Sequence, residues 1–522
     1  MSWTAGYVSD VAYTAGYFSE MNPTRLPLAL LNAGYAPPKV QNACELGFGQ
    51  GVSIAIHAAA QPHVNWYGDD FNPSHAAFAN WMVDASGAKA TLTDESFAEF
   101  CARDDLPDFD FIGLHGIWSW ISPENRDLIV DFLRRKLRVG GVAYISYNVL
   151  PGWAAAMPLR DMLARHGDVM GSAGQSSVGK MDAALEFMDR MFQLNPAWVR
   201  ANPILTDKLA QLKTMPKVYL AHEYLNRHWR PMYFTEIADI LSAAKLDFAC
   251  SAHLTDAVEE AHLTVEQRQF LAEIEDEAFR EMARDYFTNA QFRRDYWIKG
   301  GRILPAAERI GEIRNLPVVL VAPRDKAPKT LQTALGEVNL QPEIYDPILD
   351  LLSDHAPRTV HQLEQALAEK PIQLLQIIQA LMILIGTGTV AQAQPDTIVS
   401  QARKTTRALN DALTQQSRYS DQVQTLASPV TGGGVGVHRM EQLFVAADRR
   451  GDGGQTAQID YAWQALRAQN ERLVKDGETL QTEQQNRDRL QELAQLLSSR
   501  RPALAALGIA DASSPQSRPK KR

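Results

Sequence analysis

Three glycines at alternate positions, placed between a strand-like and a helix-like segment, constrain this chain more than any other feature. Glu45 precedes them, and Gly47, Gly49 and Gly51 form a turn after a strand-like run that begins at Val40. Glycine is required at such a turn because a Cβ atom would block the approach of the backbone to a ligand or forbid the torsion angles. The turn therefore predicts a Rossmann-like domain that holds a nucleotide-like ligand.

The spacing of these glycines distinguishes between ligands. A dinucleotide fingerprint requires G-x-G-x-x-G, and its third glycine would fall at position 52, which is Val52. Gly51 instead completes the pattern E-x-G-x-G-x-G. This pattern resembles motif I of class I S-adenosylmethionine (SAM) methyltransferases, in which the glycine turn passes beneath the methionine part of the cofactor. The resemblance implies that Glu45, Gly47, Gly49 and Gly51 bind SAM, and an NAD-dependent oxidoreductase is the more distant alternative.

A second strand-like run begins at Val64 and ends in two acids, Asp69 and Asp70. A carboxylate at the end of the second strand accepts both ribose hydroxyls of the ligand in Rossmann-like folds. The pattern Gly-x-Asp-x-Asn-Pro fits the methyltransferase form and selects Asp70 over Asp69. We therefore predict Asp70, with its neighbour Phe71, in the cofactor site.

Three more strand-like runs continue the pattern, at residues 90–94, 109–115 and 140–147. Residues 123–137 have apolar positions at helical spacing between the last two. Alternating strands and helices imply an α/β fold with a parallel, doubly wound, Rossmann-like sheet and a ligand site at the carboxyl ends of its strands. Asp94 and Glu95 then fall where this fold contacts adenine.

Composition limits the possible functions. A chain of 522 residues is too long for one core, so about two to four domains are expected. The net charge of −9 argues against general nucleic-acid binding. The most apolar stretch, residues 374–385, is too short to span a bilayer. We expect a cytoplasmic protein, because no secretory signal is evident and the three scattered cysteines fit a reducing compartment and not a metal site.

The sequence changes character after about residue 165. The predicted order is a SAM-binding domain, a helical regulatory domain, a winged-helix-like domain, a C-terminal helical region and a disordered tail: 1–165, 166–325, 335–400, 401–510 and 511–522. The winged-helix-like prediction depends on helices at 343–353, 359–368 and 372–385, followed by a short extended segment. Residues 371–385 contain no Lys or Arg, so this third helix offers nothing to phosphates, and a packing or partner-recognition role is the better interpretation.

Longer segments resemble a bacterial family of methyltransferases that carry a methyltransferase regulatory domain. Residues 13–26, 115–123 and 146–153 resemble the catalytic part, residues 216–300 the regulatory domain, and residues 426–430 a later motif. Some members of this family are protein-lysine methyltransferases, notably ones that modify bacterial outer-membrane proteins. The resemblance therefore implies a protein substrate. Asn22 departs from the family, because many members carry His at that position.

The chemistry of methyl transfer suggests further candidates. The sulfonium of SAM is already activated, so the reaction needs positioning and a deprotonated nucleophile. His115, at the end of the fourth strand, could hold the cofactor or take a proton, or it could bond loop backbone. Asn148 and Tyr147 end the fifth strand, where N-methyltransferases often grip the target nitrogen; a merely structural strand end is the alternative. We predict that three tryptophans lie near the opening of this same site or in an interdomain contact: Trp118, Trp120 and Trp153.

Other features have simpler interpretations. The spacing of His222, Glu223 and His228 is not that of a metal motif, so structural hydrogen bonding is the better interpretation. A near-repeat places Thr-Ala-Gly-Tyr at 4–7 and at 14–17; the second copy could form a lid with Tyr17 near the cofactor, and the first could pack or be disordered. The glycine-rich residues 432–436 read as a loop.

The sequence thus predicts a SAM-dependent methyltransferase that acts on a side-chain nitrogen of a protein, with lysine as the expected target. A methyltransferase for a small metabolite or glycan is the first alternative. A non-catalytic SAM sensor or scaffold is the second. The oligomeric state is left open.

Overall fold

The computed structural model describes residues 6–8, 10–11, 13–172, 174–451 and 454–511. The predicted disordered tail lies outside the described residues except for Asp511. Thr4 and Ala5 of the first Thr-Ala-Gly-Tyr copy also lie outside them.

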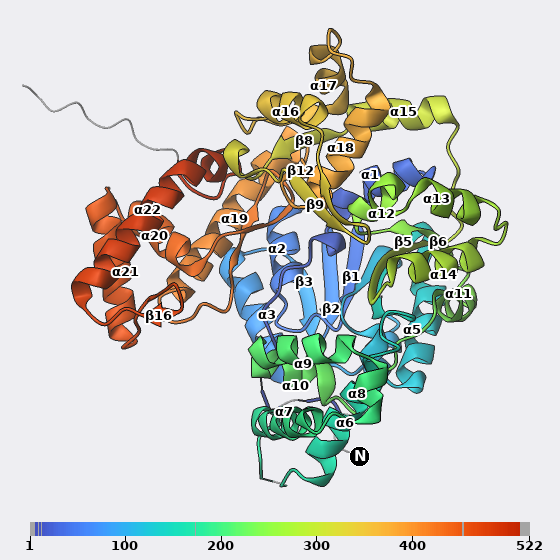
Figure 1. The fold of residues 1–522 in the computed structure, drawn as a ribbon. Helices are drawn as coiled ribbons and strands as arrows, with labels where there is room; N and C mark the ends of the chain where they lie inside the picture. Colours follow the sequence, from blue (N-terminus) through green and yellow to red (C-terminus); the bar gives the residue numbers. More distant parts are fainter. Residues whose placement is uncertain (1–5, 9, 12, 173, 452–453, 512–522) are drawn as a thin grey trace, which may run out of the picture.

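A seven-stranded sheet forms the centre of the molecule, with the strand order β3-β2-β1-β4-β5-β7-β6 (Figure 1). All five strands predicted from the sequence are present, within a few residues of the predicted bounds. They are β1 (Asn42–Leu46), β2 (Asn65–Asp69), β3 (Ala90–Thr93), β4 (Phe109–Leu114) and β5 (Leu137–Asn148). Neighbouring members of this set pair in parallel. Their order reverses direction at β1, so the carboxyl ends of β1 and β4 meet at a switch point, where open α/β sheets bind ligands.

The prediction of a purely parallel sheet was wrong, because two later strands extend it. β7 (Phe292–Ile298) pairs antiparallel with β5, and β6 (Asp247–Ser251) pairs antiparallel with β7. Both strands come from the range predicted as a helical regulatory domain. The alternation of strands and helices in the first part of the chain carried no information about them, so they could not be inferred from it. The sheet is mixed, and it continues into the later region.

Two layers of helices cover the sheet because alternate side chains of each strand point to opposite faces. One core contains Tyr144 and Tyr296, and it packs against α1 (Leu26–Ala33), α2 (Val52–Ala60) and α3 (Pro73–Ser86). The other contains Tyr147 and Trp297, and it packs against α4 (Phe97–Cys101), α5 (Pro123–Lys136) and α11 (Phe234–Ser242). Tyr144 and Tyr147 therefore belong to different sides of the molecule.

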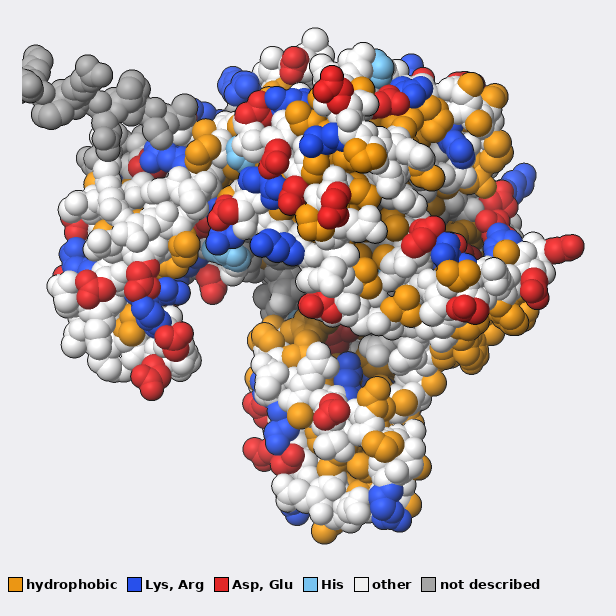
Figure 2. Space-filling view, turned by 45° about the horizontal axis from the view of Figure 1, so that its top comes forward, with side chains coloured by type: hydrophobic (Ala, Val, Ile, Leu, Met, Phe, Trp, Pro, Cys, Tyr) orange, Lys and Arg blue, Asp and Glu red, His pale blue; other side chains and the backbone are white. Residues whose placement is uncertain are grey.

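Five helices after β5 make a unit with a core of its own (Figure 1). They are α6 (Met157–Val169), α7 (Ser177–Gln193), α8 (Ala197–Ala201), α9 (Ile204–Thr214) and α10 (Lys217–Tyr224). Trp153 and Tyr224 belong to this core, together with leucines and methionines of the helices. Figure 2 shows the unit projecting from the main body, with charged side chains of both signs on its surface.

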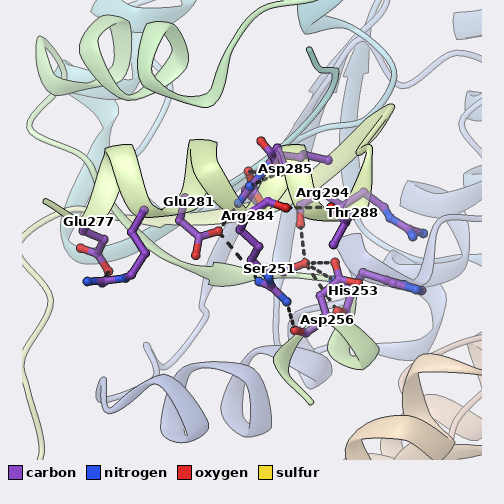
Figure 3. A network of polar contacts seen from close by, with 12 residues as sticks. Ser251, His253, Asp256, Glu277, Glu281, Arg284, Asp285, Thr288 and Arg294 are labelled. Atoms are coloured by element: carbon purple, nitrogen blue, oxygen red, sulfur yellow. Dashed lines mark hydrogen bonds and ion pairs between the residues drawn. The ribbon is translucent and has the colours of Figure 1, made fainter. Parts of the chain in front are cut away.

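A buried ion network anchors the two added strands. The Arg293 guanidinium on β7 lies 2.8 Å from carboxylate oxygens of Glu281, Asp285 and Asp295. Glu281 and Asp285 belong to α14 (Glu277–Thr288), which is joined to β6 by η4 (Leu254–Ala257), α12 (Glu259–His262) and α13 (Val265–Ala272). In Figure 3, Arg284 of α14 reaches Asp256 of η4, whose carbonyl oxygen accepts its hydrogen bond. Because such networks are costly to break once buried, they fix α14 on the sheet.

The region after β7 contains the predicted strand and three predicted helices. β8 (Pro317–Leu320) lies between β11 (Arg358–Thr359) and β12 (Val390–Gln392), and the helices are α16 (Pro342–Leu351), α17 (Val360–Ala366) and α18 (Leu374–Gly386). α15 (Ala306–Asn315) precedes them, and a hairpin of β9 (Thr330–Thr333) and β10 (Gly336–Asn339) follows the predicted linker. The helices and strands match the predicted order, but the winged-helix fold itself stays a prediction.

The C-terminal region is largely helical, as predicted. Its elements are α19 (Asp396–Gln416), β13 (Thr425–Ser428), β14 (Gly433–Gly436), α20 (Arg439–Arg449), α21 (Gln455–Ala468), β15 (Val474–Lys475), β16 (Glu478–Thr479) and α22 (Glu483–Ala506). α19 packs against α2 and α3, so this region touches the catalytic sheet's helical layer directly. Within the described residues, no helix is both long and apolar enough to cross a membrane.

The loop between β13 and β14 holds the N-terminal segment in place. The Gln61 side-chain amide donates hydrogen bonds to Asn22 Oδ1 at 2.8 Å and to the Gly432 carbonyl at 2.7 Å. The hydroxyl of Thr24 and the amide of Asn22 donate to the Thr431 carbonyl at 3.0 and 3.3 Å. Asn22, the position that departs from the family, is therefore part of a bridge between the two ends of the chain.

This bridge leads to a first prediction. A Cβ atom at Gly433 would lie 2.3 Å from the Tyr17 hydroxyl and 2.5 Å from Asn22 Nδ2, and that hydroxyl is bonded to His57. We expect Gly433→Ala to destabilise the protein by about 1–3 kcal/mol, the usual cost of overpacking, in urea denaturation. The matched control is Gly436→Ala on the same strand, where a Cβ meets open space. Equal stability of the two variants would contradict the bridge.

Candidate functional site

One cavity lies at the carboxyl ends of β1, β2 and β4, where the sequence places its motifs. It is lined by the glycine turn, by the loops after β2, β3 and β4, by η3 (Trp118–Trp120) and the start of α5, and by the N-terminal segment. The lining residues are Gly6, Tyr7, Tyr13, Thr14, Gly16, Phe18, Glu45, Gly47, Phe48, Gly49, Gln50, Asp69, Asp70, Phe71, His75, Ser96, Phe97, Ala98, His115, Gly116, Ile117, Trp120, Ile121, Ser122, Asn125 and His228.

All three glycines of the turn have left-handed backbone torsions, with φ of +66° at Gly47, +58° at Gly49 and +71° at Gly51. These torsions explain why the turn needs glycine. Gly47 and Gly49 line the cavity, whereas Gly51 does not. A Cβ at Gly51 would lie 2.3 Å from the Cβ of Ala79, so Gly51 serves the packing of the turn on α3.

Asp70 is bonded to the glycine turn. One carboxylate oxygen accepts a hydrogen bond from the Gly49 amide at 2.8 Å, and the other accepts from the Asn72 amide at 3.0 Å and lies 3.0 Å from His75 Nδ1. The register predicted for the end of β2 therefore places this carboxylate at the cavity, next to Phe71, which also lines it. The acid and the turn are positioned by each other.

Two further carboxyl groups line the cavity without protein partners for all of their oxygens. Glu45 Oε2 and Asp69 Oδ1 are buried and have no hydrogen-bond partner among the described residues. Burial, together with the negative charge of Asp70, raises the pKa of both carboxyl groups well above the ordinary range. These oxygens are available to a ligand that brings hydroxyl or ammonium groups.

His115 forms one wall of the cavity. Its ring stacks on Phe18 with centroids 3.6 Å apart, and its Nδ1 lies 2.7 Å from the Tyr144 hydroxyl. The next residue, Gly116, donates its amide hydrogen to Ser146 Oγ at 2.8 Å, which fixes the loop after β4. Burial lowers the pKa of His115 to about 4, so the ring is neutral near pH 7.

Several predicted site residues lie outside the cavity lining. Tyr147 is fully buried on the other face of the sheet, and its hydroxyl donates to Asp295 at 2.5 Å. The backbone amide of Asn148 donates a hydrogen bond to Ser119 Oγ at 2.8 Å. Asp94 and Glu95 precede lining residues without belonging to the lining, and the Glu95 carboxylate pairs with Arg103 at 3.3 Å.

The predicted tryptophans have separate positions. Trp120 lines the cavity, Trp118 is fully buried in the core beside α5, and Trp153 packs in the core of the helical unit. The three side chains therefore do not lie together at the opening of the cavity. The alternative interpretation, interdomain and core packing, fits Trp118 and Trp153.

The N-terminal segment contributes more to the cavity than the sequence indicated. Tyr13 and Tyr7 line it, whereas Tyr17, the predicted lid residue, points elsewhere and lies 3.1 Å from His57 Nε2. Tyr7 packs edge-on against Phe71 with centroids 5.7 Å apart. The near-repeat was the available signal, since residues of both Thr-Ala-Gly-Tyr copies reach the cavity.

Comparison with known proteins adds the family. Residues 216–299 match the model of a predicted methyltransferase regulatory domain. An uncharacterised protein of Synechocystis sp., sll1526, is 40% identical over 515 residues, which cover 98% of this chain and 100% of the relative. An uncharacterised protein of Rickettsia prowazekii, RP789, is 27% identical over 292 residues, 54% of this chain and 51% of that protein.

The fold is similar to that of a solved structure along almost the whole chain. The structure of PKMT2 from Rickettsia typhi in complex with AdoHcy matches with a TM-score of 0.68 and 17% identity, over 95% of this chain and 100% of that one. A second structure of PKMT2 from Rickettsia typhi matches with a TM-score of 0.64 and 16% identity, over 95% of this chain and 99% of that one. The likeness therefore includes the helical and C-terminal regions as well as the sheet.

The low pKa of His115 generates a prediction about stability. The unfolded chain binds a proton at this histidine below about pH 6.5, but the folded protein does so only below about pH 4, so His115 makes stability fall as the pH drops between these values. In His115→Asn, which can retain a bond to Tyr144, the loss of unfolding free energy from pH 7 to pH 4 should be smaller by about 3 kcal/mol.

Urea denaturation at a series of pH values measures this difference. His361→Asn, at an exposed position on α17, is the control and should follow the wild-type curve. Parallel curves for His115→Asn and the wild type would show that the ring is not held neutral.

Proposed function

This chain belongs to the bacterial class I SAM-dependent methyltransferases that carry a methyltransferase regulatory domain, and we propose that it methylates a lysine side-chain nitrogen of a protein. One observation carries the choice of substrate: the fold likeness to the protein-lysine methyltransferase PKMT2 extends through every accessory region. Large accessory regions could hold a macromolecule, whereas in a methyltransferase for a small molecule they would close the pocket. The family supplies the reaction, and this likeness supports a macromolecular substrate.

The residues of the cavity fit SAM. The buried, unpartnered oxygens of Glu45 and Asp69 suit the hydroxyl and ammonium groups of such a ligand. Gly47 and Gly49 leave room for it beside the backbone, and Asp70 stands at the end of β2, where ribose hydroxyls are bound in this fold. When bound, SAM supplies a methyl group already activated by the positive sulfonium.

The chain's own residues then have to position the cofactor and to exclude water. Phe97 and Ile117 offer apolar walls after β3 and β4, as an adenine ring requires. Tyr13 lies across from Gly49, with its ring 3.8 Å from the place of a Cβ there, and so covers the glycine turn. An aromatic face at this position attracts a cationic sulfonium. His115, neutral at pH 7, would serve as a wall and a hydrogen-bonding group.

The roles of Tyr147 and Asn148 remain hypotheses, and the structure suggests different roles from those predicted from the sequence. Because the Tyr147 hydroxyl donates its hydrogen bond to Asp295 of β7, Tyr147 would act by supporting the pairing of β5 with β7. Asn148 would act through its side-chain amide, whose Nδ2 is buried without a partner among the described residues. Asp94 and Glu95 would act by positioning the loop that presents Phe97.

Asp70→Ala tests the cofactor assignment. Removing a carboxylate that makes charge-assisted hydrogen bonds should weaken the binding of S-adenosylhomocysteine by about 1.5–3 kcal/mol in isothermal titration calorimetry. Asp84→Ala, at an exposed position on α3, is the matched control and should bind like the wild type. If Asp69→Ala alone weakens binding, the register at the end of β2 is wrong by one residue.

Methyl transfer from isotopically labelled SAM into a lysate of the source cell tests the substrate. We expect label in discrete protein bands that is stable to base, and its loss in Gly49→Asp, which places a charged side chain beside the cofactor path. Label confined to small molecules or glycans would replace the proposal with that substrate class. No label despite SAM binding would favour a sensor or scaffold.

A further inference from the structure

The two neighbouring acids at the end of β2 serve opposite faces of the sheet, because side chains alternate along a strand. Tyr67 packs against the core beside α4 and α5, so Asp69, two residues later, lies on that same face. Asp70 has its contacts on the other face, where its carboxylate accepts the Gly49 amide hydrogen at 2.8 Å and lies 3.0 Å from His75 of α3. The two carboxyl groups therefore reach different parts of one cavity, which both of them line.

Asp69 is next to the apolar part of the cavity. Its backbone carbonyl accepts the Gly47 amide hydrogen at 2.9 Å, and a Cβ atom at Gly47 would lie 2.9 Å from Ile117 Cγ1 and 3.7 Å from Phe97 Cζ. Phe97 begins α4 after β3, Ile117 follows β4, and both pack against the same core as Tyr67. The whole cavity, with its open mouth, encloses about 1340 Å³, more than the about 300–1,000 Å³ of a typical ligand pocket. We call Asp69, Phe97 and Ile117, which all line it, the slot.

The side chain of Asp69 offers hydrogen-bonding capacity that the described part of the chain leaves unused. The residue is 1% exposed, and its Oδ1 is buried without a hydrogen-bond partner among the described residues. Burial and the charge of Asp70 raise the pKa of this carboxyl well above the ordinary range, which favours its protonated form. A protonated carboxyl carries an acceptor and a donor side by side. A ligand that fills the slot is therefore expected to bring one donor next to one acceptor.

Adenine presents that pair on a flat ring. Its 6-amino group donates, and the ring nitrogens on either side of that group accept. The ribose hydroxyls have another partner, because the acid at the end of the second strand binds them in this fold and Asp70 holds that place on the opposite face. The polar groups after β3 are engaged elsewhere: Ser96 Oγ donates to the Glu99 carboxylate at 2.7 Å, and the Glu95 carboxylate pairs with Arg103 at 3.3 Å.

We propose that Asp69 recognises the adenine edge of SAM and makes the cofactor site selective for adenine. The carbonyl oxygen of its neutral carboxyl accepts a hydrogen bond from the 6-amino group, and its hydroxyl donates one to the adjacent ring nitrogen. Phe97 and Ile117 hold the faces of the ring. This inference rests on SAM being the ligand of the cavity. It assigns to the end of β2 a contact that the sequence placed at Asp94 and Glu95.

A ligand that lacks only the 6-amino group tests this contact. In isothermal titration calorimetry with the full chain, the 6-desamino analogue of S-adenosylhomocysteine should bind the wild type about tenfold more weakly than S-adenosylhomocysteine, because the buried oxygen is then left unpaired. Asp69→Ala should bind the two ligands with equal affinity, since the partner of the amino group is gone. If Asp69→Ala discriminates against the analogue as strongly as the wild type, the proposal is overturned.

Two further variants separate Asp69 from other polar groups. Glu95→Ala removes an acid that does not line the cavity, and Asn125→Ala removes a side-chain amide that lines it at the start of α5. Both variants should keep the wild-type preference for S-adenosylhomocysteine over the desamino analogue. Loss of that preference in either of them, with its retention in Asp69→Ala, would assign the adenine edge to that residue instead.

The ribose is the competing partner of the Asp69 carboxyl. The 2′-deoxy analogue of S-adenosylhomocysteine should lose the same factor in affinity in Asp69→Ala as in the wild type, because the two groups do not touch and their effects are then additive. A loss that is present in the wild type and absent in Asp69→Ala would place the carboxyl at the ribose and overturn the proposal.

Asp69→Asn tests the neutral pairing and keeps the shape of the side chain, so it also serves should Asp69→Ala not fold. An amide presents an acceptor and a donor as a protonated carboxyl does, so this variant should bind S-adenosylhomocysteine within about threefold of the wild type and keep its discrimination. Affinity as low as that of Asp69→Ala would overturn the neutral pairing.

The two proposals fail in different ways. A wild type that does not bind S-adenosylhomocysteine would refute the proposed function itself. Binding of S-adenosylhomocysteine with equal affinity for the desamino analogue would refute the role of Asp69 alone.

Discussion

The structure of the site depends on how one short N-terminal segment is held. The carbonyl of Glu20 accepts a hydrogen bond from the Tyr296 hydroxyl at 2.6 Å, and its carboxylate pairs with Arg294 at 2.7 Å. Burial alone would raise the pKa of Glu20, but Arg25 and Arg294 hold it below its ordinary value, so the acid stays charged. Strand β7 thus fixes this segment from one side, while the β13–β14 loop fixes it from the other. This placement also determines the positions of Phe18 and Tyr13, which line the cavity.

The features that the sequence predicted correctly depend on residues that are close together in the chain. The turn from β1 to α2 needs glycines at 47, 49 and 51 because of their positive φ, and that need is visible in the pattern itself. Asp70 was selected by an equally local motif, and its carboxylate lies within hydrogen-bonding distance of the turn. The strands and their parallel order followed from alternating patterns along one stretch of chain.

What the sequence missed depends on long-range pairing. Tyr147 and Asn148 were expected at the site because they end a strand, but Arg293 and Phe292 pair with them across the sheet. No local pattern announces that a strand far downstream will cover this edge. The same limit applies to Tyr7 and Tyr13: a near-repeat drew attention to the segment, but the packing of both rings against His222, a residue far away in the sequence, is visible only in the structure.

The region that matches the regulatory-domain model is built into the catalytic fold. It contributes β6 and β7 to the central sheet, Arg294 to the placement of Glu20, and α10, whose His222 ring packs against Tyr7 and Tyr13. A region with these contacts cannot act as a detachable inhibitor, because removing it would expose the buried edge of β5 and free the N-terminal segment. Any regulation that it exerts must therefore pass through the paired strands β5 and β7 or through helix α10.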